Sequence, residues 1–124
     1  VDLKSGGNFA GFIVAADAIL AIANPNTRII PGHGKVVGRA ELEVWRNVLE
    51  QVRQRVQKLI HSRKTLEQAI AAKPTADLDE KMGSNFISPD AMVEAAYKSL
   101  SAAKPGAATK TDGAAGPGRG TPKN

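Results

Sequence analysis

The chain has no cysteine among its 124 residues, and histidine is scarce, with only His33 and His61. Disulfide bonds and thiolate zinc sites are therefore excluded, and cysteine usage leaves the compartment open. A catalytic zinc needs about three protein ligands plus an open position for water. The sequence has no His-x-His pair, no Glu-x-x-His helix and no phosphate-binding glycine loop. Read from its residues alone, the chain offers one candidate ligand and no complete active site.

Aromatic residues and long apolar runs are also few. Five aromatic residues are present, so the core must consist mainly of Ala, Val, Ile and Leu. The longest apolar stretch, Phe9–Ala23, is too short to span a bilayer and carries Asp17 in its middle. It resembles a buried helix more than a signal peptide, which would have a basic start. The chain begins with Val1, and we expect the natural protein to begin upstream.

The net charge is +5, and the C-terminal 21 residues account for much of it. Residues 104–124 hold three prolines, five glycines and four cations against Asp112. Such a segment cannot bury enough apolar surface to offset its ordering entropy, so we predict a disordered basic tail. The remaining body, residues 1–103, is predicted to fold and is nearly balanced in charge. The charge therefore does not indicate a nucleic-acid surface, and neither a nucleic-acid nor a membrane partner is expected.

Apolar spacing predicts mostly helices with one short strand. A helix that returns directly into an Ile-rich strand is an α/β pattern. The first helix has a broad apolar face and should be largely covered, and the carboxylates of residues 76–85 lack the spacing of a calcium loop. The expected elements are a helix over Phe9–Ala23 capped by Asn8, a buried strand over Arg28–Ile30, a helix from Arg39 or Ala40 to Ser62, a helix over Thr65–Ala72 with Thr65 and Gln68 as a capping box, an exposed polar loop over Ala76–Asn85, and a helix from the Ser88 cap to about Ala103.

The long central helix carries an apolar stripe at alternating spacings of three and four residues: Leu42, Trp45, Leu49, Val52, Val56 and Leu59. This stripe suits a helix that lies on a domain core, and it also suits a coiled coil. The basic stretch Arg53–Lys64 is interpreted as a solvated helix face because no aromatic residues interleave to stack on bases. His61, at the end of this helix, is expected to be exposed.

One histidine lies in a more distinctive setting. Pro31 should end the strand because it has no N–H for a ladder, and Gly32 and Gly34 flank His33. A histidine on a glycine-flanked turn at the end of a strand is well placed to direct one ring nitrogen at a metal. A plain turn histidine remains the alternative at this point.

The string Val1-Asp2-Leu3-Lys4-Ser5-Gly6-Gly7-Asn8, an Ala/Leu-rich helix, and then Thr27-Arg28-Ile29-Ile30-Pro31-Gly32-His33-Gly34 resembles the C-terminal part of metallo-β-lactamase-fold hydrolases. The segments Ala40-Glu41-Leu42, Lys64–Ile70 and Lys73-Pro74-Thr75 resemble one bacterial branch, often labelled cyclase or quinoprotein-relay zinc hydrolases. The resemblance covers about residues 1–102.

The resemblance implies an α/β fold, with this chain as the mostly helical C-terminal part of a four-layer αβ/βα architecture. It implies that His33 is a metal ligand, that one or two zinc ions bind in the intact protein, and that metal-activated water attacks a carbonyl-type small-molecule substrate. The remaining ligands of the family would lie before Val1, and Asp2 is not assigned as one of them. A bacterial protein is implied, either periplasmic, secreted or cytoplasmic.

We therefore expect this chain alone to be inactive and marginally stable. The alternative, from another class, is a non-catalytic helical interaction module that dimerises through the heptad-like stripe and binds acidic partners through its basic tail.

Overall fold

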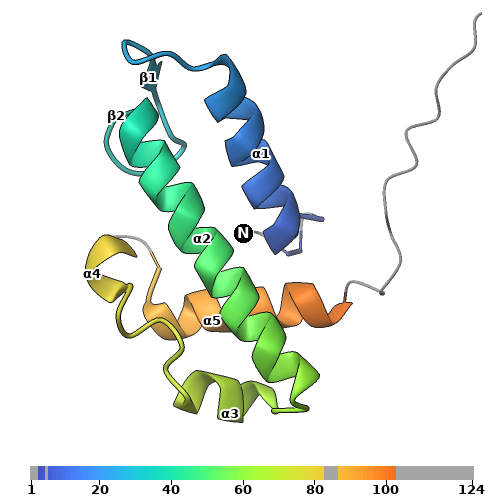
Figure 1. The fold of residues 1–124 in the computed structure, drawn as a ribbon. Coiled ribbons are helices and arrows are strands. Elements are labelled where there is room, and N and C mark those ends of the chain that lie inside the picture. The colour runs from blue at the N-terminus through green and yellow to red at the C-terminus, as the bar shows by residue number, and fades with distance from the viewer. Residues whose placement is uncertain (1–2, 5, 83–86, 103–124) are drawn as a thin grey trace, which may run out of the picture.

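The helix α2 (Arg39–His61) is the longest element, and the others are arranged along it (Figure 1). The computed structural model describes residues 3–4, 6–82 and 87–102. These residues form α1 (Phe9–Ile22), a hairpin of β1 (Arg28–Ile29) and β2 (Val37–Gly38), then α2, α3 (Leu66–Ala71), α4 (Asp79–Met82) and α5 (Pro89–Ala102). The described chain is thus mostly helical with a two-stranded antiparallel sheet, which is compatible with the predicted α/β class. These residues do not by themselves form four layers.

Three helices begin at the N-cap residues that the sequence predicts. The Asn8 side chain accepts a hydrogen bond from the Gly11 N–H at 2.6 Å. Thr65 and Gln68 form the predicted reciprocal capping box, with bonds of 3.3 and 3.0 Å. Ser88 Oγ likewise accepts an N–H bond in the first turn of α5. These caps satisfy backbone donors that a helix leaves without an internal partner.

The end of α2 has an unusual residue in its cap. The Arg63 N–H donates to the Ile60 carbonyl at 2.9 Å, and the Lys64 N–H donates to the Leu59 carbonyl at 3.0 Å. This pair of bonds is the Schellman pattern. Arg63 adopts φ +56°, a left-handed conformation in which glycine is normally preferred. The chain then turns sharply into α3.

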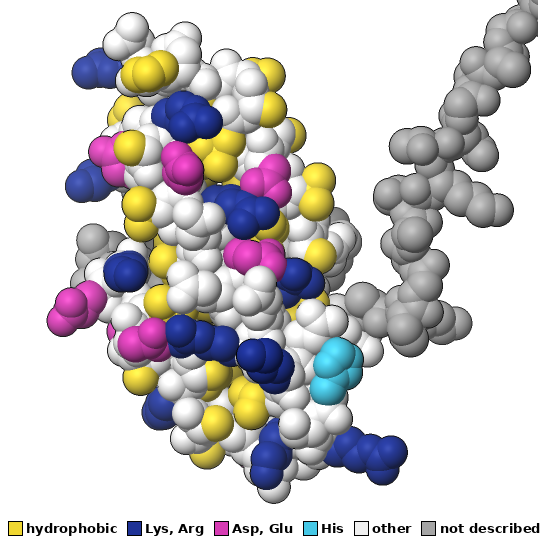
Figure 2. All heavy atoms as spheres, in the orientation of Figure 1, with side chains coloured by type: hydrophobic (Ala, Val, Ile, Leu, Met, Phe, Trp, Pro, Cys, Tyr) yellow, Lys and Arg dark blue, Asp and Glu magenta, His cyan; other side chains and the backbone are white. Residues whose placement is uncertain are grey.

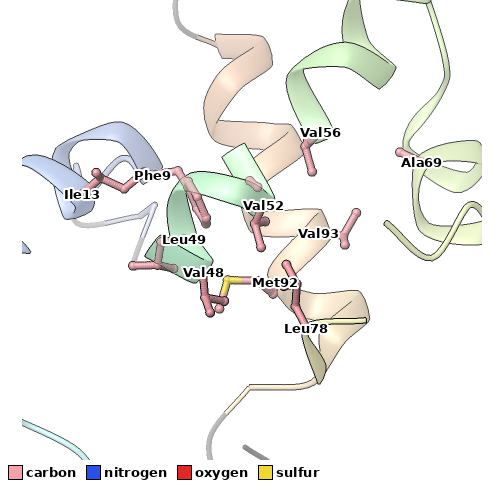
Figure 3. Packing of buried hydrophobic residues seen from close by; sticks show 11 residues of the cluster. Phe9, Ile13, Val48, Leu49, Val52, Val56, Ala69, Leu78, Met92 and Val93 are labelled. Carbon is pink, nitrogen blue, oxygen red and sulfur yellow. The ribbon is translucent and has the colours of Figure 1, made fainter. Parts of the chain in front are cut away.

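The core lies where α2 crosses α5, with α1 packed on one side and α3 and Leu78 on the other (Figure 3). The apolar stripe of α2 therefore lies on the core of its own chain, as one of the two interpretations predicted. Met92, Val93 and Ala96 face inward from α5 as expected. The buried cluster consists of Phe9, Ile13, Val48, Leu49, Val52, Val56, Ala69, Leu78, Met92, Val93 and Ala96.

The prediction that the first helix is largely covered is wrong for the described residues. α1 runs antiparallel beside α2 and buries only Phe9, Ile13 and Ala16 (Figure 1). Phe12, Val14, Ile19 and Ile22 are exposed, with Val14 at 66% and Ile22 at 85%. α2 and α5 cover only one side of α1, and no further layer of the described chain covers the rest.

The prediction of an exposed polar loop over residues 76–85 is also partly wrong. Leu78 is 2% exposed and anchors the segment in the core, and α4 follows it. The segment is further attached to α2 because Asp77 forms a two-pronged ion pair with Arg55, which also donates to the Pro74 carbonyl at 2.8 Å. Residues 83–86, together with the predicted tail over 104–124, lie outside the described residues. None of the described helices is long and apolar enough to cross a membrane.

Candidate functional site

The hairpin at one end of α2 carries the predicted metal ligand (Figure 1). Arg28 pairs with Gly38, and Ile29 pairs with Val37. The strand is shorter than predicted, since it ends at Ile29, and it is not buried. Ile30 is 82% exposed, because the partner strand covers one edge of this backbone and nothing described here packs over its face.

His33 lies in the exposed turn that joins the two strands. Gly34 has φ +94°, so a residue with a side chain would be strained at that position. A Cβ atom added at Gly32 or Gly34 would meet nothing within 4 Å. The space beside the backbone is therefore open at both glycines, and the His33 side chain between them is exposed.

The second histidine is too far away to share a metal with the first. His61 is the last residue of α2, at the opposite end from the hairpin, and it is exposed as predicted. A 23-residue helix is about 35 Å long at a rise of 1.5 Å per residue. The structure thus separates the two imidazoles instead of bringing them together.

No group of three or more His, Cys, Asp or Glu side chains in the described part of the chain could hold a metal ion. The residues present therefore do not fit a complete zinc site, and His33 stands as a single candidate ligand. Asp2 lies outside the described residues.

A shallow hollow of about 530 Å³ lies beside the hairpin. It is formed by the turn after α1 and by both strands, and His33 is not among its lining residues. The lining consists of Pro25, Asn26, Thr27, Arg28, Val36, Val37 and Gly38. The hollow and the imidazole are thus separate features of the same end of the molecule.

A second hollow, which the sequence reasoning missed, lies near the other end of α2. It has a volume of about 340 Å³ and lies between the last turns of α2 and the segment after α3. Its lining residues are Arg55, Lys58, Leu59, Ser62, Ala72 and Pro74. The basic stretch of α2 was visible in the sequence, but its closeness to Ala72 and Pro74 depends on the turn at Arg63, which no residue pattern announced.

Ion pairs fix the helices around these features. Arg46 on α2 donates to Asp17 on α1 at 2.6 and 3.0 Å. The hydrogen bond from Arg46 lowers the pKa of Asp17 below its ordinary value of 3.8. In the same way, the hydrogen bond from Arg55 lowers the pKa of Asp77. These carboxylates are held ionised by their partners, so they position helices and are poor candidates for proton transfer.

Comparison with known proteins identifies no relative: no family model, no curated protein and no solved structure matches the chain.

Proposed function

We propose that this chain is the C-terminal part of a metal-dependent hydrolase of the metallo-β-lactamase fold, and that His33 supplies one metal ligand in the intact protein. The observation that carries the proposal is the exposed hairpin turn, in which His33 stands between two glycines with open space beside each. This geometry accords with the Ile-Pro-Gly-His-Gly string on which the family resemblance rests. An imidazole so presented can be reached by ligands from other segments.

The surface around the hairpin supports the same proposal. Ile22, Ile30 and Val36 are 85%, 82% and 50% exposed at this end of the molecule. Large aliphatic side chains that are left exposed are typical of a surface that another layer covers. The proposed architecture is a four-layer αβ/βα domain in which residues 1–103 supply the last helices and one edge hairpin.

In this proposal the metal is zinc, as one or two ions, and its remaining donors come from residues outside this chain. The substrate is a small molecule with a carbonyl-type centre, which the bound metal would help to hydrolyse. Because this chain contributes one donor, it is inactive by itself, and its own residues are assigned no catalytic step.

The test uses the longer natural protein, read from the upstream gene sequence. A His-x-His-x-Asp-His motif is expected within about 200 residues upstream, a size that suits one domain. The His33→Ala variant of that protein should lose hydrolysis and bound zinc, measured by elemental analysis, whereas the matched His61→Ala variant should keep both. An upstream sequence without the motif would overturn the proposal, and so would unchanged zinc content in His33→Ala.

The rival interaction module gains no support from α2. Its heptad-like stripe would have to be exposed in order to dimerise, yet Leu49, Val52 and Val56 are 2% exposed or less within this chain's own core. A dimer through that face would require the core to open. The hydrolase therefore remains the function proposed.

A further inference from the structure

The groove between α2 and the segment after α3 combines an apolar floor with a basic rim. Leu59, Ala72 and Pro74 supply the apolar part of the lining, and Arg55 and Lys58 supply the cations. Figure 2 shows hydrophobic side chains between Lys and Arg side chains over the lower half of α2. A hollow of about 340 Å³ that is open to solvent has room for one or two aliphatic side chains of a longer segment.

The positive charge at this end of the molecule is poorly balanced. Within residues 58–73 the sequence has four Lys and Arg residues and one carboxylate, Glu67. Among the described residues, Lys58, Arg63 and Lys64 form no ion pair. Lys73 does pair with Asp90 at 2.7 Å, and Arg55 pairs with Asp77, so those two charges are already compensated.

The helix dipole gives a partial explanation of these cations, because positive side chains are favoured in the last turn of a helix. That effect accounts for Lys58 within α2. It does not account for Arg63, which occupies a left-handed cap position where glycine would cost less, nor for the apolar hollow beside the charges.

We propose that this groove binds an acidic peptide segment of a partner protein, with an aliphatic side chain seated on Leu59, Ala72 and Pro74. Its carboxylates would face Lys58 in the lining and Arg63, which follows the lining residue Ser62 in the chain. The apolar floor selects for a side chain, and the uncompensated cations select for negative charge. A nucleic acid is disfavoured because the lining has no aromatic ring for base stacking.

This binding face is independent of the proposed hydrolase site. The hairpin lies at the N-terminal end of α2 and α3 at its C-terminal end (Figure 1). Residues near the C-terminal end line the groove, whereas His33 belongs to the hairpin turn. A result at one site therefore leaves the other untouched.

The test measures fluorescence anisotropy of the full 124-residue chain with a fluorescein-labelled peptide of Glu and Leu repeats, roughly 12 residues long. Two control peptides replace every Leu by Ser or every Glu by Lys. We expect the Glu/Leu peptide to bind at least about tenfold more tightly than either control, and to bind more weakly as salt is raised. Equal affinity for the Glu/Ser peptide would overturn the proposal that the apolar groove contributes to binding, and would leave only diffuse charge attraction.

Variants localise the binding. Lys58→Glu reverses a charge of the lining, and Ala72→Gln fills the hollow from an exposed position without a change of charge. Each should weaken binding by about fivefold or more, whereas Lys35→Glu, which makes the same charge change in the exposed hairpin turn, should change it by less than about twofold.

If Lys58→Glu loses helical structure by circular dichroism, Lys58→Ser replaces it with the same expectation. Equal weakening by Lys35→Glu would overturn the proposal. So would tighter binding to phosphatidylserine vesicles than to the peptide, which would assign the surface to a membrane instead.

Discussion

The backbone N–H of Phe9 donates a 2.7 Å hydrogen bond to the Oγ atom of Ser99, across 90 residues of sequence. Both residues are buried, with Phe9 at 1% and Ser99 at 8% exposure. Phe9 is the first residue of α1, where a backbone N–H has no partner within the helix. A side chain of α5 thus completes the beginning of α1.

Removing this acceptor should destabilise the chain. Ser99→Ala leaves a buried N–H without a partner, and we expect the free energy of unfolding to fall by about 1–2 kcal/mol. Urea denaturation followed by circular dichroism measures it. Ser101→Ala, on the exposed side of the same helix, is the matched control and should change the free energy by less than about 0.5 kcal/mol. Equal effects of the two changes would mean that the Phe9–Ser99 bond contributes nothing.

The second prediction concerns the stripe of α2. Leu49→Ala removes a side chain that is 2% exposed, and it should lower the free energy of unfolding by about 2–5 kcal/mol. Val44→Ala, on the 52% exposed face of the same helix, should cost under about 1 kcal/mol. Analytical ultracentrifugation of the unmodified chain tests the same point from another side: a dimer that Leu49→Ala dissociates while the helices survive would favour the interaction module.

The third prediction concerns the left-handed residue after α2. Arg63→Gly should raise the free energy of unfolding by roughly 1 kcal/mol, because glycine adopts a positive φ without steric cost. Arg63→Ala removes the same charge but keeps the strain, so it is the control and should give no such gain. If the proposed groove is correct, both variants should weaken binding of the Glu/Leu peptide, which separates the charge of Arg63 from its backbone.

The fourth prediction concerns acid. Asp17 and Asp77 have pKa values lowered by their arginine partners, so the folded chain binds their protons less readily than the unfolded chain does. Their stabilising effect is complete above the ordinary value of 3.8 and is lost as the pH falls towards the lower folded pKa. The melting temperature should therefore drop as the pH falls below about 4, more steeply at low salt than at high salt.

Substitution of Asp77 tests whether these carboxyl groups cause the acid sensitivity. In Asp77→Asn the decline of the melting temperature below about pH 4 should become shallower, because one of the linked protonations is gone. Asp90→Asn also removes one exposed carboxylate that pairs with a cation, and it is the control for the loss of a single negative charge. A profile for Asp77→Asn identical to that of the unmodified chain would assign the acid sensitivity to other groups.

The fifth prediction concerns zinc and this chain alone. A single imidazole cannot retain a catalytic metal, so calorimetric titration should show no stoichiometric zinc binding tighter than about 1 µM. His33→Ala should leave that titration unchanged. Stoichiometric micromolar binding that His33→Ala abolishes would mean that this chain assembles its own site.

The sequence was informative wherever a local rule decides the outcome. Asn8, Thr65 and Ser88 fix three helix beginnings through hydrogen bonds to nearby backbone, and the spacing of apolar residues on α2 identifies the face that packs. Each of these signals depends on residues that are close together in the sequence. They could therefore be read without any knowledge of the rest of the fold.

Prediction from the sequence failed where the structure of a segment depends on what packs against it. The Ile29-Ile30 pair predicts a buried strand, yet Ile30 is exposed because no described layer covers the hairpin. Residues 76–85 read as solvated from their carboxylates, yet Leu78 enters the core and Asp77 pairs with Arg55 across 22 positions. At the candidate site, the turn that presents His33 was foreseen. The separation of that turn from the neighbouring hollow was not, because it depends on how the two strands are paired.

The position of α5 in the core also sets an order of events during synthesis. Val52 and Val56 are buried in one cluster with residues that lie about 40 positions later in the chain, Met92, Val93 and Ala96. When α1, the hairpin and α2 have left the ribosome, their inner faces therefore stay exposed until α5 also emerges. Chaperone contact in that interval is expected to concentrate on the stripe of α2, and to end once α5 docks and Ser99 meets Phe9.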